Sequence, residues 1–238
     1  MTVTTVVDRL RLHSWRLRDA LQDQVRGRAH RRDVFQRIYD GNLWGDAESL
    51  SGRGSGTVAT DAIRRELPIL FARYGIRSLL DAPCGDFHWM KHVVGSLNRY
   101  VGVDIVPRLI EQNASLYGTD TVSFVCADIA TDRLPRADAV LCRDCFIHLP
   151  TRLIRRALAN FHASGIRYLL LTNDRDVDSY HDIPVGSFRR VNFMQPPFSF
   201  PEPLATASDG TGDNRQLCLW ELSSLFFDDV RGDRSRDE

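Results

Sequence analysis

Short apolar runs alternate with longer stretches of mixed polarity through the middle of the chain. Each run ends in a polar or acidic residue, and most of the stretches between them repeat their apolar positions at helical spacing. The runs are Ser78–Asp81, Tyr100–Asp104, Val122–Asp128, Ala137–Cys142 and Tyr168–Thr172. Strands that are apolar on both faces and alternate with helices are typical of a parallel sheet covered on both sides. The pattern therefore predicts an α/β fold with a Rossmann-like sheet.

Helical spacing predicts three helices around these strands, from Val58 to about Tyr74 and over Pro107–Leu116 and Thr151–Ala163. Two further runs follow, around Phe188–Phe193 and Gln216–Leu222, with no helix-length pattern between them. We expect these two runs to form an antiparallel hairpin at the edge of the sheet.

The N-terminal part of the chain is also predicted to be helical. Apolar residues recur there at the spacing of one stripe, at Val6, Leu10, Leu17 and Leu21. The first 37 residues carry nine arginines against four aspartates. We expect a solvated helix that covers one edge of the core, with a partner-binding or membrane-surface arm as the alternative.

A glycine-rich loop that follows this arm divides the chain. We predict an N-terminal helical arm and cofactor lid over residues 1–57, a catalytic domain over 58–225 and a charged tail over 226–238. The amphipathic arm is compatible with a homodimer.

Composition limits the kinds of partner. The 238 residues include 31 basic and 31 acidic side chains, and this zero balance argues against nucleic acid as the main partner. No apolar window of about 18 residues predicts a membrane span. The five cysteines have no small-domain framework, which favours reduced thiols and a cytoplasmic location. Cys142 and Cys145 form a lone C-x-x-C, too little for a zinc knuckle.

Aspartates stand at or just beyond the ends of all the predicted strands, and ligands of open α/β sheets bind beyond those ends. The residues are Asp81, Asp104, Asp128, Asp144 and Asp174. A role as helix N-caps is the alternative for each of them. Asp104 follows Asp81 by 23 residues, the interval at which an acid of a βαβ unit reaches a ribose hydroxyl pair.

The turn after the first predicted strand argues against a nicotinamide dinucleotide. Its sequence, Asp81–Phe87, lacks the G-x-G-x-x-G pattern that lets the backbone approach a pyrophosphate. Asp86 would also stand near that pyrophosphate. A cofactor without phosphate groups would not be repelled by the Asp86 carboxylate.

These residues resemble class I S-adenosylmethionine-dependent methyltransferases over about residues 58–222. The resemblance rests on the turn Asp81–Phe87, on Asp104, on Ala127–Ile129 and on the terminal hairpin. It implies a seven-stranded sheet whose last strand is inserted antiparallel. The turn departs from the family pattern, because only Gly85 remains of the usual three glycines.

The resemblance also implies a role for individual residues. It places Asp81, Ala82 and Gly85 near the methionine part of the cofactor, Asp104 and Ile105 at the ribose, Asp128 and Ile129 at the adenine, and Cys142 and Arg143 beside the sulfonium. Trp89 opens the next helix and is expected to touch the cofactor or the lid. Arg53, in the glycine-rich loop, is expected to bind the cofactor carboxylate.

The segment after the fourth strand is where we expect the acceptor chemistry. His148 is the candidate general base, with a purely structural histidine as the alternative. Asp144, also expected to take part in catalysis, and Asp174 end neighbouring strands. They are candidate ligands for Mg²⁺ that would orient an acceptor hydroxyl.

The fragments 81–90 and 142–149 are similar to bacterial sugar O-methyltransferases, including those that build mycobacterial methylmannose polysaccharide. We therefore expect a hydroxyl of a sugar, an oligosaccharide or another small molecule as the acceptor. A small-molecule N-methyltransferase is one alternative, although Gln195–Phe198 departs from the amine-methylating motif in position and first residue. A binding or scaffold protein without turnover is the other.

Overall fold

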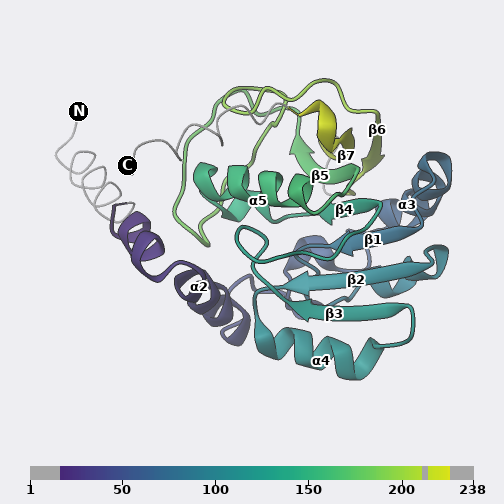
Figure 1. The fold of residues 1–238 in the computed structure, drawn as a ribbon, viewed down its shortest axis with the longest axis horizontal. Helices are drawn as coiled ribbons and strands as arrows, with labels where there is room; N and C mark the ends of the chain where they lie inside the picture. The colour runs from purple at the N-terminus through teal and green to yellow at the C-terminus, as the bar shows by residue number, and fades with distance from the viewer. Residues whose placement is uncertain (1–16, 211–213, 226–238) are drawn as a thin grey trace.

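A seven-stranded sheet forms the centre of the molecule, in the order β3-β2-β1-β4-β5-β7-β6 (Figure 1). The computed structural model describes residues 17–210 and 214–225. The strands are β1 Ser78–Asp81, β2 Arg99–Asp104, β3 Val122–Cys126, β4 Ala139–Cys142, β5 Tyr168–Asp174, β6 Ala205–Ser208 and β7 Arg215–Glu221. β7 runs antiparallel to both of its neighbours, and all other neighbouring strands are parallel. The predicted sheet, mostly parallel with an antiparallel last strand, is confirmed.

Helices cover both faces of this sheet, and one of them, α2 Arg28–Asp40, lies beyond the ends of its strands (Figure 1). The others are α3 Asp61–Tyr74, α4 Pro107–Tyr117 and α5 Thr151–Ala163, and residues 17–26 are helical as well. Successive strand residues point to opposite faces, so Leu79 packs with α3 in one buried cluster and Leu80 packs with α5 in the other. This double burial explains why the strands are continuously apolar.

Local signals set the ends of two helices. Gly75 ends α3 in the left-handed conformation at φ 65°, which glycine adopts without steric cost. Pro107 begins α4, where its missing N–H leaves no hydrogen bond unmade.

The predicted hairpin is wrong in its first strand. β7 is paired with Ala205–Ser208, whereas Phe188–Phe193 forms no strand. The backbone N–H of Asp174 donates to the carbonyl of Val191, and that of Phe193 donates to Asn173 Oδ1, so this segment lies against the end of β5. Val191 and Phe193 of this loop are buried in the core, where Phe193 packs against other aromatic rings, whereas Phe188 is exposed. The true β6 is a short edge strand without an apolar run, so periodicity does not reveal it.

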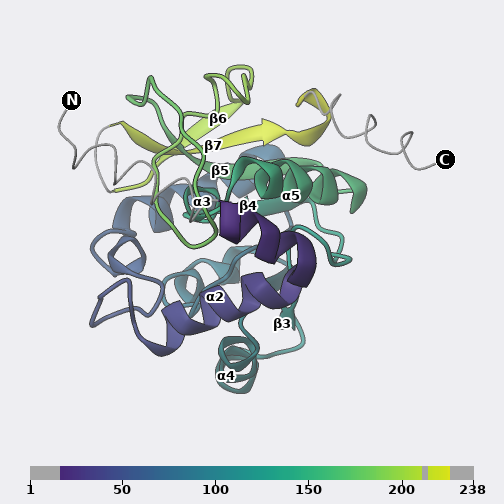
Figure 2. The same cartoon turned by 90° about the vertical axis from the view of Figure 1, so that its left-hand side faces the viewer.

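The N-terminal arm lies across the domain beyond the carboxyl ends of β2 and β3 (Figures 1 and 2). Val34 and Phe35 of α2 pack against the same core cluster as α5. Leu17 and Leu21, two members of the predicted stripe, are 56% and 58% exposed, so this stripe is not the face that packs. Val6, Leu10 and the predicted tail lie outside the described residues. Within the described part of the chain, no helix is both long enough and apolar enough to cross a membrane.

Candidate active site

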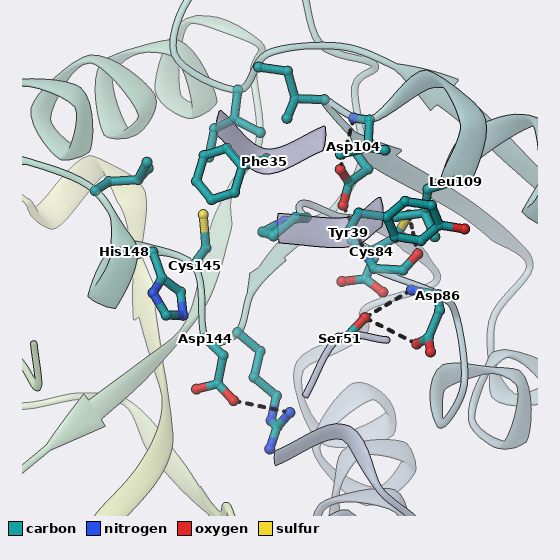
Figure 3. Close-up of a pocket in the computed structure, with 18 of the residues that line it drawn as sticks. Phe35, Tyr39, Ser51, Cys84, Asp86, Asp104, Leu109, Asp144, Cys145 and His148 are labelled. Atoms are coloured by element: carbon teal, nitrogen blue, oxygen red, sulfur yellow. Dashed lines mark hydrogen bonds and ion pairs between the residues drawn. The ribbon is translucent and has the colours of Figure 1, made fainter. Parts of the chain in front are cut away.

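A pocket opens at the carboxyl ends of β1, β2 and β4 and has about 1160 Å³ of empty space, including the open solvent at its mouth (Figure 3). α2 and the glycine-rich loop close its other sides. Ten of the predicted site residues line it: Asp81, Gly85, Trp89, Asp104, Ile105, Asp128, Ile129, Arg143, Asp144 and His148. In Figure 3, Asp104 and Leu109 lie on one side of the pocket, and Asp144, Cys145 and His148 lie on the other.

Two buried carboxylates, Asp81 and Asp104, lie at the ends of β1 and β2 and give this side of the pocket, the first side, its acidic groups. Burial raises the pKa of Asp81 to about 7, although the Tyr100 hydroxyl donates to this carboxylate at 2.6 Å. Burial likewise raises the pKa of Asp104 to about 6, against hydrogen bonds from the N–H groups of Val106 and Gly85. Both acids are held by neighbouring groups, so they are preorganised at the ends of β1 and β2.

The turn after β1 is covered by the glycine-rich loop. Gly85 has φ +53°, and a Cβ at this position would lie 2.1 Å from Ser51 Oγ. Asp86 accepts hydrogen bonds from the hydroxyls of Ser49 and Ser51 and from the N–H of Leu50. Gly85 is therefore required for the loop to approach, and Asp86 fastens that loop over the pocket.

Asp128, predicted at the adenine, is bonded to the N-terminal arm. Its carboxylate accepts from Arg31 Nε at 2.6 Å and from the N–H of Ala130 at 2.9 Å. Arg31 also pairs with Asp23 at 2.5 Å, and Asp23 pairs with Arg152 of α5. These ion pairs tie α2 to the sheet and to α5.

Arg143 joins the other end of the loop to the sheet. Its guanidinium binds Asp209 at 2.7 Å and donates to the carbonyl of Gly54 at 2.7 Å. It also lies 5.5 Å from the centre of the Trp89 ring. Arg53, the residue predicted to bind the cofactor carboxylate, is exposed and is absent from the pocket wall. The buried arginine that contacts the glycine-rich loop is therefore Arg143, whereas Arg53 of that loop is exposed.

His148 lines the pocket, and a backbone carbonyl fixes its tautomer. Its Nδ1 lies 2.8 Å from the carbonyl oxygen of Ser187, which can only accept, so Nδ1 carries the proton and Nε2 has a free lone pair. Burial lowers the pKa of His148, against the Ser187 hydrogen bond. The Trp44 ring stacks on the imidazole with 5.0 Å between ring centres.

The predicted magnesium ligands do not form a cation site. Arg215 pairs with Asp144 and lies 3.6 Å from Asp174, so its guanidinium stands between the two carboxylates. Asp174 is fully buried and also binds Arg190 at 3.1 Å. Among the described residues, no cluster of three or more metal-binding side chains occurs. The donor set does not fit Mg²⁺.

Two other predicted contacts, Ala82 and Cys142, are fully buried in the core and are absent from the pocket wall. Residues 1–57 were expected to cover the cofactor, but the three residues of α2 that line the pocket, Arg31, Phe35 and Tyr39, were not among the predicted site residues. These three residues recur every fourth position, which places them on one face of a helix, and this spacing is the signal that could have revealed them.

The chain is similar to known proteins in part of its sequence and in its fold. Residues 79–164, a little over a third of the chain, match the family model for a methyltransferase domain. This segment, which runs from β1 to the end of α5, is similar to a methyltransferase domain. No curated protein matches the sequence.

Among the solved structures with a similar fold, two have methyltransferase activities in their names. One is the 1,6-didemethyltoxoflavin-N1-methyltransferase of Burkholderia thailandensis, 20% identical over 78% of this chain and 89% of that chain, with a TM-score of 0.52. The other is human N-acetylserotonin methyltransferase, 12% identical over 84% of this chain and 57% of that chain, with a TM-score of 0.50. At these identities the likeness concerns the fold of the domain alone.

Proposed function

We propose that this protein transfers a methyl group from S-adenosylmethionine to a hydroxyl group of a small molecule, a sugar or an oligosaccharide. One observation carries the proposal: His148, with Nε2 free to accept a proton, lines the same pocket as the buried acids Asp81 and Asp104. A hydroxyl acceptor must lose its proton during methylation, and this imidazole is in a position to take it.

The residues on the first side of the pocket suit the cofactor. Asp104 would hold the ribose hydroxyls, and Asp81 would face the cationic methionine part. Asp128 and Ile129 would meet the adenine, which the apolar side chains of Val106 and Leu109 would flank. When bound, S-adenosylmethionine supplies a methyl group on a sulfonium, an electrophile that needs no metal.

His148 would act on the acceptor through its Nε2 atom. Burial lowers the pKa of its imidazole, so the ring is neutral near pH 7 and can accept the hydroxyl proton as the new carbon–oxygen bond forms. The Ser187 carbonyl keeps the required tautomer, and the stacked Trp44 ring fixes the orientation of the imidazole. Orientation of this kind supplies much of the rate gain in a displacement reaction.

The second side of the pocket suits an acceptor with a ring. Phe35, Trp44, Cys145 and His148 provide aromatic and weakly polar surface there, as expected for stacking on a sugar face or on a planar ring. The Gln195–Phe198 segment, which resembles an amine-methylating motif, lies elsewhere: Phe198 packs against Phe193 and Phe200 and does not line the pocket. These contacts favour a hydroxyl over an amine.

The proposal assigns residues 1–57 to an arm and lid over the cofactor and residues 58–225 to catalysis. It also places the protein in the cytoplasm, where its five free thiols would remain reduced.

The test has two steps, both on the full chain. Calorimetry with S-adenosylmethionine should show binding, and its absence would favour a scaffold protein. A radiolabelled methyl donor, offered with a panel of sugars, oligosaccharides, phenols and amines, should then label a hydroxyl compound. The product is examined by NMR for the methylated atom. A methyl group found only on nitrogen would contradict the hydroxyl proposal.

A further inference from the structure

Arg31 has one guanidinium nitrogen that makes no hydrogen bond within the described part of the chain. The residue is 2% exposed and lines the pocket from α2. Nε donates to Asp128, and Nη1 donates to Asp23, but Nη2 has no partner. Buried donors in folded proteins are almost always satisfied, so this nitrogen points to an acceptor on a bound ligand.

The partner of Arg31 narrows the chemistry of that ligand. Asp128 Oδ2 accepts from Arg31 Nε, and Oδ1 accepts from the N–H of Ala130. Each carboxylate oxygen has a second lone pair, so Asp128 can still accept from a ligand. A free donor on Arg31 therefore lies beside a carboxylate acceptor. The complementary ligand edge has a donor next to an acceptor.

We infer that Arg31 and Asp128 together recognise the Watson–Crick edge of the cofactor adenine. Asp128 accepts from the N6 amino group, and Arg31 Nη2 donates to the N1 atom. This inference rests on the proposed function and adds to it a specificity residue from outside the matched methyltransferase segment. It makes the N-terminal helix part of the cofactor site.

The arm holds Arg31 in place for this role. Asp23 binds both Arg31 and Arg152. The ring of the neighbouring His30 is also buried, and its Nε2 donates to the Asp19 carboxylate at 2.9 Å. Phe35, one turn further along α2, packs against the core and also lines the pocket. A guanidinium fixed before binding loses little freedom when the ligand arrives.

The test uses S-adenosylhomocysteine and two analogues, in which CH replaces N1 or N7 of the adenine. Calorimetry measures their dissociation constants for the wild-type protein and for Arg31→Met. For the wild type, we expect the N1 replacement to weaken binding by about tenfold or more, because a charged donor loses its acceptor. The N7 replacement should leave affinity unchanged. Arg31→Met should bind S-adenosylhomocysteine and the N1 analogue equally.

The ratio between analogues separates recognition from stability. A purely structural role of Arg31 would weaken all three ligands by the same factor in Arg31→Met. Arg28→Met is the matched control, because Arg28 lies on the same helix, pairs with Asp132 and does not line the pocket. This variant should keep the wild-type discrimination.

Several outcomes would overturn the inference. They are equal affinity of the wild type for S-adenosylhomocysteine and the N1 analogue, selective loss with the N7 analogue, and unchanged discrimination in Arg31→Met. If Arg31→Met does not fold, Arg31→Lys keeps the positive charge beside Asp128 but lacks the second donor nitrogen, and it should also lose the discrimination against the N1 analogue. A wild type that binds none of the three ligands contradicts the proposed function as well, whereas binding without discrimination contradicts only the role of Arg31.

Discussion

Arg215 forms an ion pair with Asp144, and this pair places a guanidinium at the point where the sequence suggested a metal ion. The same guanidinium lies 3.6 Å from Asp174. We therefore expect methyl transfer to be independent of divalent cations. Activity after exhaustive treatment with a chelator should equal that of the untreated protein. Loss of activity that added Mg²⁺ restores would contradict the assignment of Arg215 as the cation between these carboxylates.

Replacing His148 tests the proposed base. His148→Ala should lower kcat by about 100-fold or more, as expected for loss of general-base catalysis, while the dissociation constant of S-adenosylmethionine stays unchanged. The exposed His92, which does not line the pocket, provides a matched control, and His92→Ala should retain full activity. A His148→Ala variant with wild-type kcat would leave this histidine a structural role.

The pH dependence of kcat should carry the signature of the same group. A protonated imidazole cannot accept a proton, and burial lowers the pKa of His148 below its ordinary 6.5. The rate should therefore be constant at and above neutral pH and fall only in more acidic solution. A rate that keeps rising above pH 7 would indicate a different base.

Cofactor affinity should increase with pH because of Asp81 and Asp104. Burial raises their pKa values to about 7 and about 6, so in the free protein both take up protons as the pH falls through this range. The ribose hydroxyls and the cationic methionine part favour the ionised forms. Binding should therefore release protons near pH 6.5 and weaken by up to about tenfold per pH unit and per group at lower pH. Calorimetry in two buffers of different ionisation enthalpy measures the protons released.

The variant Asp104→Asn identifies one of the two groups. It should bind S-adenosylhomocysteine more weakly at pH 8 and show a flatter pH profile below pH 6. A wild-type affinity that does not change between pH 5 and pH 8 would exclude both carboxylates from cofactor binding.

Gly85 is expected to control closure of the glycine-rich loop. In Gly85→Ala, the new Cβ would lie 2.1 Å from Ser51 Oγ in a backbone conformation with φ +53°. We expect about tenfold weaker cofactor binding, from a conformational cost of roughly 1–2 kcal/mol, and faster trypsin cleavage after the exposed Arg53. Gly95→Ala is the control, because a Cβ at Gly95 meets no atom within 4 Å. Equal cleavage rates in both variants would contradict the role of Gly85.

Most of the sheet could be predicted because its signals are local. A buried parallel strand needs apolar residues on both faces, and Leu79–Leu80 and Leu169–Leu170 show this directly in the sequence. β6 could not be predicted in this way. Ala205–Ser208 is a short edge strand defined by its pairing with β7, whereas Val191 and Phe193 of the run expected as the partner of β7 are buried in a loop.

The residues of the candidate site also include some that could be predicted from the sequence and some that could not. Asp81, Asp104 and Asp128 were found from their places at strand ends, and all three line the pocket. Arg53 was chosen from its glycine-rich surroundings, which do not determine which way an exposed side chain points. The loop instead meets the pocket through Ser51 and Ser55.

The sequence by itself determined the strands and helices from α3 to β5 and the row of acids at the strand ends, because these depend on neighbouring residues and on the period of each element. Only the tertiary structure decided the partner of each acid. Arg31 meets Asp128 across 97 positions, and Arg215 meets Asp144 across 71. No local pattern encodes such pairs, since each results from where the folded backbone brings two distant charges together. Those pairings turned a predicted metal site into an arginine site and made the N-terminal arm a wall of the pocket.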